Sequence, residues 1–139
     1  MELIESKEVI QQINNYPKEA REKLLELRDL IITTAQTTDG VKKLLETRKW
    51  GEPSYLSKSG STIRIDWKEK TPDKCYVYFI CTTELVSTFR FLFGDELSLE
   101  ANRSIVLNLK EPLPKQNLAR CFQLALTYHK VKHLPLLGV

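Results

Sequence analysis

The sequence lacks the motifs by which most enzyme classes are recognised. Its five glycines are scattered and form neither a G-x-G-x-x-G pattern nor a P-loop, which argues against a nucleotide-cofactor site. It contains no G-x-S-x-G elbow, and neither of its two histidines has a Ser or Cys partner at a diagnostic spacing. These absences favour a non-enzymatic binding or carrier domain.

Long hydrophobic runs are also missing. No apolar run approaches the ~20 residues that span a bilayer, and acidic residues stand in Met1–Glu5 where a signal peptide carries Lys or Arg. The three cysteines, Cys75, Cys81 and Cys121, are odd in number and have no C-x-x-C spacing. We therefore expect a cytoplasmic protein without a membrane partner, in which all three thiols are reduced and serve as small core residues.

The length of the chain suits one domain spanning residues 1–139. The net charge of +3 is uneven, because residues 101–139 hold six Lys or Arg against one acidic residue. This basic C-terminal third predicts either a protein-interaction surface for a phosphate-rich partner or simply a solvated face. No Arg-rich run or RNP-like aromatic motif accompanies it, which disfavours nucleic-acid binding.

The first fifty residues read as helical. Ser6 is a candidate cap for a short helix that ends before Tyr16, and a longer helix follows Pro17. The longer helix carries apolar residues at helical spacing, namely Ala20, Leu24, Leu27 and Ile31. Val41, Leu44 and Leu45 then predict a third, shorter helix that runs into Trp50.

After residue 51 the apolar period changes from about 3.6 to 2. Strands are predicted over 53–57, 62–68, 75–81 and 103–109, with a helix over 85–93 and a last helix after Pro114. In the second strand Ile63, Ile65 and Trp67 face inward, whereas Arg64, Asp66 and Lys68 face outward.

With these elements in place, the chain resembles the YdhG-like family of small bacterial domains, most of which have unknown function. The resemblance rests on Tyr16-Pro17, on the W-G-x-P-x-aromatic signature from Trp50 to Tyr55, and on Ile105–Leu109 followed by Glu111–Pro114. It implies an α+β fold in which an antiparallel sheet is packed with N-terminal helices and a C-terminal helix. Because some relatives are described as frataxin-like iron chaperones, it also implies a possible iron cargo.

The predicted helix after Pro17 offers one set of iron ligands. Four carboxylates fall within an arc of about 80° on its exposed side. They are Glu19, Glu22, Glu26 and Asp29. Such a stripe of oxygen ligands could hold iron loosely, but Lys18 and Lys23 flank it, and alternating charge is also typical of a solvated helix face.

The only histidines, His129 and His133, are spaced i, i+4 at the end of the last predicted helix. Metal ligation would require a third ligand from elsewhere in the fold. The alternative is that His129 is half-buried and hydrogen-bonded to the sheet.

The remaining candidate is an aromatic groove for a small molecule at the start of the first predicted strand. Its predicted walls are Trp50, Pro53, Tyr55, Tyr76 and Tyr78, with Arg64 as the anion-binding member. The alternative is a packing role, in which Trp50 and Pro53 fix how the third helix meets the sheet.

Overall fold

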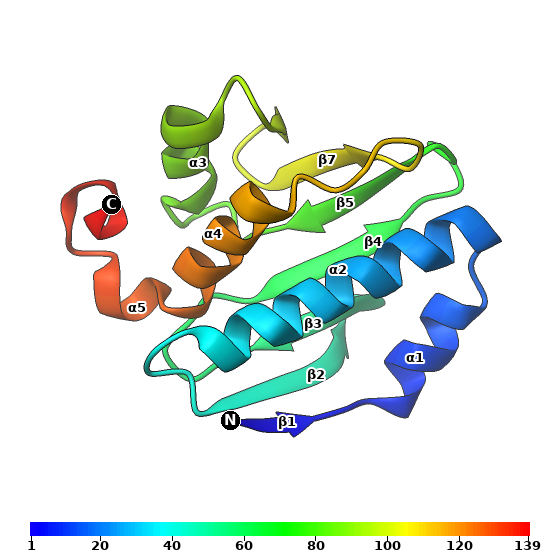
Figure 1. Cartoon of the computed structure of the whole chain (residues 1–139), viewed down its shortest axis with the longest axis horizontal. Helices are drawn as coiled ribbons and strands as arrows, with labels where there is room; N and C mark the ends of the chain where they lie inside the picture. Colours follow the sequence, from blue (N-terminus) through cyan, green and yellow to red (C-terminus); the bar gives the residue numbers. More distant parts are fainter.

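The chain folds into one seven-stranded sheet with helices packed against one of its faces (Figure 1). The computed structural model describes all residues, 1–139. In chain order the elements are β1 (Glu2–Ile4), α1 (Lys7–Asn14), α2 (Lys18–Thr37), β2 (Lys43–Lys49), β3 (Glu52–Leu56), β4 (Ile63–Trp67), β5 (Lys74–Tyr78), α3 (Leu85–Phe93), β6 (Ser98–Glu100), β7 (Ser104–Asn108), α4 (Lys115–Leu126), α5 (Tyr128–Val131) and the 3₁₀ helix η1 (Pro135–Gly138).

The strands lie in the order β1-β2-β3-β4-β5-β7-β6. All neighbours pair antiparallel except β1 and β2, which run parallel. The α+β prediction is confirmed, and the sheet is mixed rather than purely antiparallel. The strands β1 and β6, each three residues long, were not predicted because so short a segment shows no periodicity.

The two N-terminal helices form as their sequences predict. The Ser6 side chain accepts a hydrogen bond from the Val9 N–H at 3.3 Å and so caps α1. Ala20, Leu24, Leu27 and Ile31 form the buried stripe of α2. Helices α2 and α4 pack together across the same face of the sheet (Figure 1). None of the helices combines the length and the apolarity that crossing a membrane requires.

The predicted third helix is wrong: residues 43–49 form the strand β2, which pairs with β3. Leu44 and Glu46 point into the core, whereas Leu45 lies on the opposite side of the strand. The apolar–polar alternation typical of a strand was not visible in the sequence, because the second inward residue, Glu46, is charged. Leu44 and Leu45 then looked like neighbours on one helical stripe.

The two faces of the sheet differ in composition. Apolar residues such as Ile63, Ile65 and Val77 face the helices and are fully buried. Arg64 and Asp66 lie on the other face, as predicted, but they are buried rather than solvated. We call this second face, which also carries Tyr76 and Tyr78, the open face.

A buried ion pair between β2 and α2 joins the N-terminal elements to the sheet. Glu46 Oε2 lies 2.5 Å from Arg28 Nε, and Glu46 Oε1 lies 3.1 Å from Arg28 Nη2. The carboxylate also accepts hydrogen bonds from the Ser6 N–H at 3.0 Å and from the Tyr55 hydroxyl at 2.9 Å. Burial opposes ionisation of Glu46, but these hydrogen bonds outweigh it and lower the pKa of Glu46 below its ordinary value.

We expect Glu46→Gln to lower the free energy of unfolding by about 3 kcal/mol, because it removes the buried carboxylate and leaves the half-buried Arg28 with only the exposed Glu5 as a counter-charge. Since the pKa of Glu46 is lowered by folding, its contribution is present above the unfolded pKa and is lost as the pH falls through the folded pKa. Urea unfolding at pH 7 and at acidic pH measures both effects.

The matched control is Glu5→Gln. Glu5 contacts the same guanidinium at 3.1 Å but is exposed, so its loss should cost less than about 1 kcal/mol. Equal losses from the two substitutions would contradict the special role of Glu46.

Candidate functional site

A cleft of about 410 Å³ lies at the turn that joins β2 to β3. We call it the Trp50 cleft. Its lining residues come from this turn, from β3 and β4, and from the segments that follow β5 and precede β7. They are Trp50, Glu52, Arg64, Phe79, Cys81 and Arg103.

The turn holds Trp50 in an unusual backbone conformation. Lys49 pairs with Glu52, so Trp50 and Gly51 form a two-residue hairpin loop, and both have positive φ angles of 52° and 77°. Positive φ at both positions is typical of a type I′ turn, in which Asn-Gly is the favoured pair. A tryptophan in this left-handed region is strained by about 1 kcal/mol or more. Trp50 is nevertheless 80% exposed, so core packing does not compensate for the strain.

Arg64 lies beneath Trp50 on the open face. Its guanidinium carbon is 4.8 Å from the centroid of the Trp50 ring and 5.7 Å from that of Tyr78. Nη1 donates to Glu52 Oε1 at 3.2 Å, whereas the buried Nε has no hydrogen-bond partner. Only 8% of the Arg64 surface is exposed. A buried donor without a partner costs about 1–3 kcal/mol, which makes this arginine a candidate ligand-binding group.

Positive charge dominates the surroundings of the cleft. Lys68 Nζ lies 3.8 Å from Glu52 and 3.9 Å from Asp66. Burial raises the pKa of Glu52, although the charge of Arg64 opposes the shift. Burial likewise raises the pKa of Asp66, although the Tyr16 hydroxyl, 2.5 Å away, favours its ionised form. Arg103 forms no ion pair and lies 5.4 Å from the Tyr78 ring, and its charge favours the ionised form of Glu52.

The structure brings together four of the six residues predicted for the groove. Trp50 and Arg64 line the cleft, Tyr78 contacts Arg64, and Tyr76 stacks on Tyr78 with ring centroids 5.7 Å apart. Pro53 and Tyr55 are not part of it, because strand alternation turns them to the helix-covered face. Tyr55 is fully buried there and donates to Glu46.

Four lining residues were not among the predicted groove residues, namely Glu52, Phe79, Cys81 and Arg103. Cys81 was expected in the core with Cys75 and Cys121, but β5 ends at Tyr78 and Cys81 is exposed in the cleft. The other two thiols are buried, and burial raises the pKa of Cys75 to about 12 and that of Cys121 further. Arg103 is the residue before β7, and no sequence pattern links it to Arg64.

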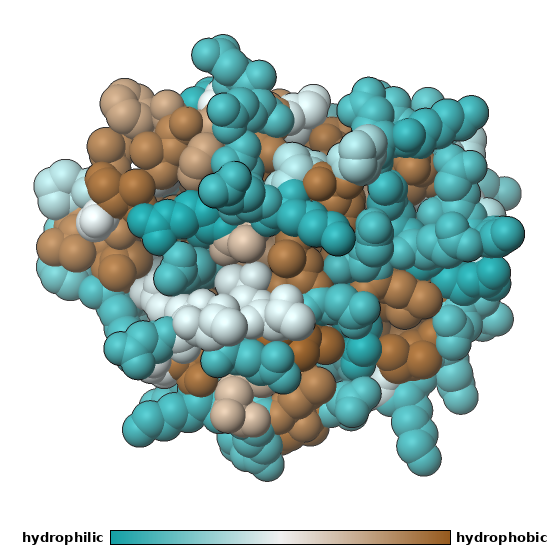
Figure 2. All heavy atoms as spheres, in the orientation of Figure 1, coloured by the Kyte–Doolittle hydropathy of each residue, from teal (hydrophilic) through white to brown (hydrophobic).

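The predicted metal ligands are not gathered into a centre. Glu19, Glu22, Glu26 and Asp29 are all exposed on α2, and hydrophilic residues dominate the end of this face where α2 begins (Figure 2). Nowhere in the chain do three His, Cys, Asp or Glu side chains lie together so that they could hold a metal ion.

The two histidines are not on one helix. His129 and His133 are both exposed, and α5 ends at Val131. The expectation of a half-buried His129 is therefore wrong. Iron binding by the α2 carboxylates stays a prediction.

No family model matches the chain, and neither the curated proteins nor the solved structures include a significant match to it. The resemblance to the YdhG-like family therefore stays a prediction. The geometry of the sites is therefore the basis of the function proposed below.

We expect Trp50→Asn to change the free energy of unfolding by less than about 1 kcal/mol. The cation–π contact with Arg64 is lost, but Asn-Gly suits the type I′ turn and relieves the strain of Trp50. Trp67→Asn is the comparator, because Trp67 packs against the core and Tyr16, and it should cost about 2 kcal/mol or more. If urea unfolding shows equal losses, Trp50 has a packing role instead.

Iodoacetamide should alkylate Cys81 first under native conditions, because Cys75 and Cys121 are buried. Peptide mass spectrometry after a short reaction would show one modified site, and Cys81→Ser should abolish it. Early modification of Cys75 or Cys121 in the folded protein would contradict the placement of the three thiols.

Proposed function

We propose that the protein is a binding domain for small anionic ligands that carry a planar group, and that the Trp50 cleft is their site. The observation that carries the proposal is Arg64. Its guanidinium is buried between two aromatic rings and retains an unpaired donor. A ligand carboxylate or phosphate would supply the missing partner.

The rest of the cleft suits such a ligand. Its volume of about 410 Å³ lies within the usual range of ~300–1,000 Å³ for small-molecule sites. The exposed indole of Trp50 offers a surface on which a planar group can stack. Arg103 adds a second cation, which forms no ion pair.

We propose binding without catalysis. The lining residues supply positive charge and aromatic surface, and no histidine lines the cleft to act as a base for Cys81. The setting that we propose is the bacterial cytoplasm, in line with the family resemblance and with three free cysteines.

An iron cargo would need a different site. The surplus positive charge of the Trp50 cleft favours anions and repels ferrous or ferric ions. Iron would have to bind to the exposed α2 carboxylates, so anion titration and iron titration distinguish the two hypotheses.

Phenyl phosphate is the probe for this proposal, because it combines a planar ring with a dianion. In titrations followed by ¹H–¹⁵N NMR, we expect saturable shifts of the Trp50 indole N–H and of the Arg64 and Arg103 signals. Phenol, which has the ring without the charge, should bind at least about tenfold more weakly, since a charge-assisted contact is worth ~1.5–3 kcal/mol.

Variants separate the two parts of the site. Arg103→Gln removes the free cation and Trp50→Asn removes the stacking surface, so each should weaken phenyl phosphate binding by about three- to tenfold. Arg120→Gln is the matched control, because Arg120 is an exposed arginine on α4 outside the cleft. Unchanged affinity in Arg103→Gln and Trp50→Asn, or scattered shifts, would contradict the proposal.

A further inference from the structure

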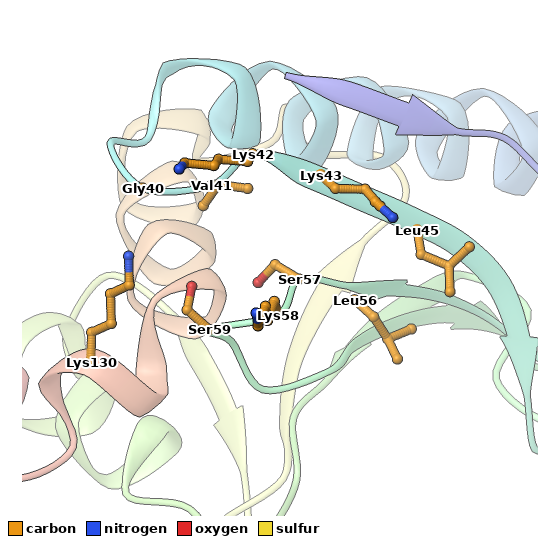
Figure 3. A pocket seen from close by; sticks show the side chains of 10 residues that line it. All are labelled: Gly40, Val41, Lys42, Lys43, Leu45, Leu56, Ser57, Lys58, Ser59 and Lys130. Carbon is orange, nitrogen blue, oxygen red and sulfur yellow. The ribbon is translucent and has the colours of Figure 1, made fainter.

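A second and larger cavity lies at the other end of the β2–β3 hairpin. Its volume is about 770 Å³, and the turn before β2, the start of β2, the end of β3 and α5 all contribute to it (Figure 3). We call it the lysine pocket. Because β2 is seven residues long, the pocket lies roughly 20 Å from the Trp50 turn, so a ligand here does not touch the Trp50 cleft.

The pocket collects positive charge without acidic partners. Four lysines line it, and none of them belongs to any of the ion pairs of the structure. They are Lys42, Lys43, Lys58 and Lys130. The acids nearest to them in the strand pairing and in the chain, Glu2 and Asp39, also form no ion pair. An anion that entered the pocket would therefore meet four ammonium groups that form no ion pair, against the two nearby acids Glu2 and Asp39.

One end of the pocket is apolar. Leu45 and Leu56 are paired across β2 and β3, and both lie on the open face, where no helix covers them. Figure 3 shows the two leucine side chains at one end of the pocket and Lys130 with Ser59 at the other. Lys43 lies beside Leu45 at the leucine end, and we call the opposite end, which holds Lys130, the cationic end.

The Lys130 ammonium group lies close to Gly40 at the cationic end. A Cβ atom on Gly40 would lie 2.5 Å from Lys130 Nζ, and the φ of Gly40 is +86°. The lysine side chain can therefore approach the α2–β2 turn because position 40 has no side chain. The His129 N–H also donates to the Ser59 carbonyl oxygen at 2.8 Å, which ties α5 to the turn after β3.

We infer that the lysine pocket binds a small anionic amphiphile, whose apolar part lies on Leu45 and Leu56 and whose carboxylate or phosphate lies among the lysines. The positive charge of the pocket favours a negatively charged ligand, and the leucine pair favours an apolar group on that ligand. Lysine ammonium groups are flexible point charges, so the pocket should accept either head group. Ser57 and Ser59 also line the pocket, but their hydroxyls already donate to the Leu126 carbonyl oxygen, so the lysines are the donors left for the anion.

The test uses n-octyl phosphate below its micelle concentration, with calorimetry for affinity and NMR for location. We expect one saturable site that shifts the signals of Leu45, Leu56 and Lys130. Inorganic phosphate and n-octanol should each bind at least about tenfold more weakly, because each lacks one of the two contacts. Raising the salt concentration should weaken octyl phosphate binding.

A double variant with Lys42→Gln and Lys130→Gln should bind octyl phosphate about tenfold more weakly. The single variant Leu56→Ser should bind it at least about threefold more weakly. Lys132→Gln is the matched control, because Lys132 is exposed in the same segment and does not line the pocket. Trp50→Asn should leave the affinity unchanged, which separates this inference from the proposed Trp50 site.

Three outcomes would overturn the inference. The first is that the double lysine variant binds octyl phosphate with unchanged affinity, or that Lys132→Gln lowers this affinity as much as the double variant does. The second is inorganic phosphate binding as tightly as octyl phosphate. The third is binding to phosphatidylglycerol vesicles without saturable binding of monomeric octyl phosphate, which would indicate a membrane surface.

Discussion

The Glu46–Arg28 ion pair is the constraint on which the arrangement of the N-terminal half depends. A carboxylate with no solvent exposure must keep its counter-charge and its hydrogen-bond donors, because an unpaired buried charge is strongly destabilising. The donors come from the cap residue of α1, from α2 and from β3. One side chain therefore determines how three separate elements meet β2.

The same ion pair also fixes the register of the β2–β3 hairpin. Glu46 lies opposite Tyr55, and the hydroxyl of Tyr55 bonds to it. A slip by one residue would turn Glu46 to the open face and Leu45 into the core. The observed register places Trp50 and Gly51 in the turn and leaves the pair Leu45 and Leu56 on the open face. Both candidate sites are thus consequences of where Glu46 is held.

The sequence predicted those elements whose residues follow one simple pattern. The stripe of α2 and the inward residues of β4 are apolar at regular spacing, and each was correctly predicted. The strand β2 was not predicted, because its two buried inward residues are the apolar Leu44 and the charged Glu46. The partner of that charge, Arg28, lies on another element. A pattern of hydrophobicity cannot identify a buried charge whose partner is distant in the sequence.

The candidate site was only partly predictable for a related reason. Arg64 was identified as an anion-binding residue beside aromatic side chains, but Cys81 and Arg103 enter the cleft from the loops that flank β5 and β7. Loop residues carry no periodicity, so only the fold brings them to Trp50. The prediction that Tyr55 lines the groove was wrong for a different reason. Its aromatic character suits a groove wall, but the alternation of side chains along β3 places it in the core.

Trp50 is the residue at which stability and the proposed function are in conflict. An exposed indole in a left-handed turn position loses about 1 kcal/mol relative to the residues that such turns favour, and a type I′ turn closes without it. The indole instead covers Arg64, whose buried Nε has no partner in the protein. Two separate unfavourable features, a strained tryptophan and an unpaired donor, therefore meet in one cleft. A ligand that stacks on the indole and pairs with the guanidinium would account for both, whereas a packing role accounts for neither.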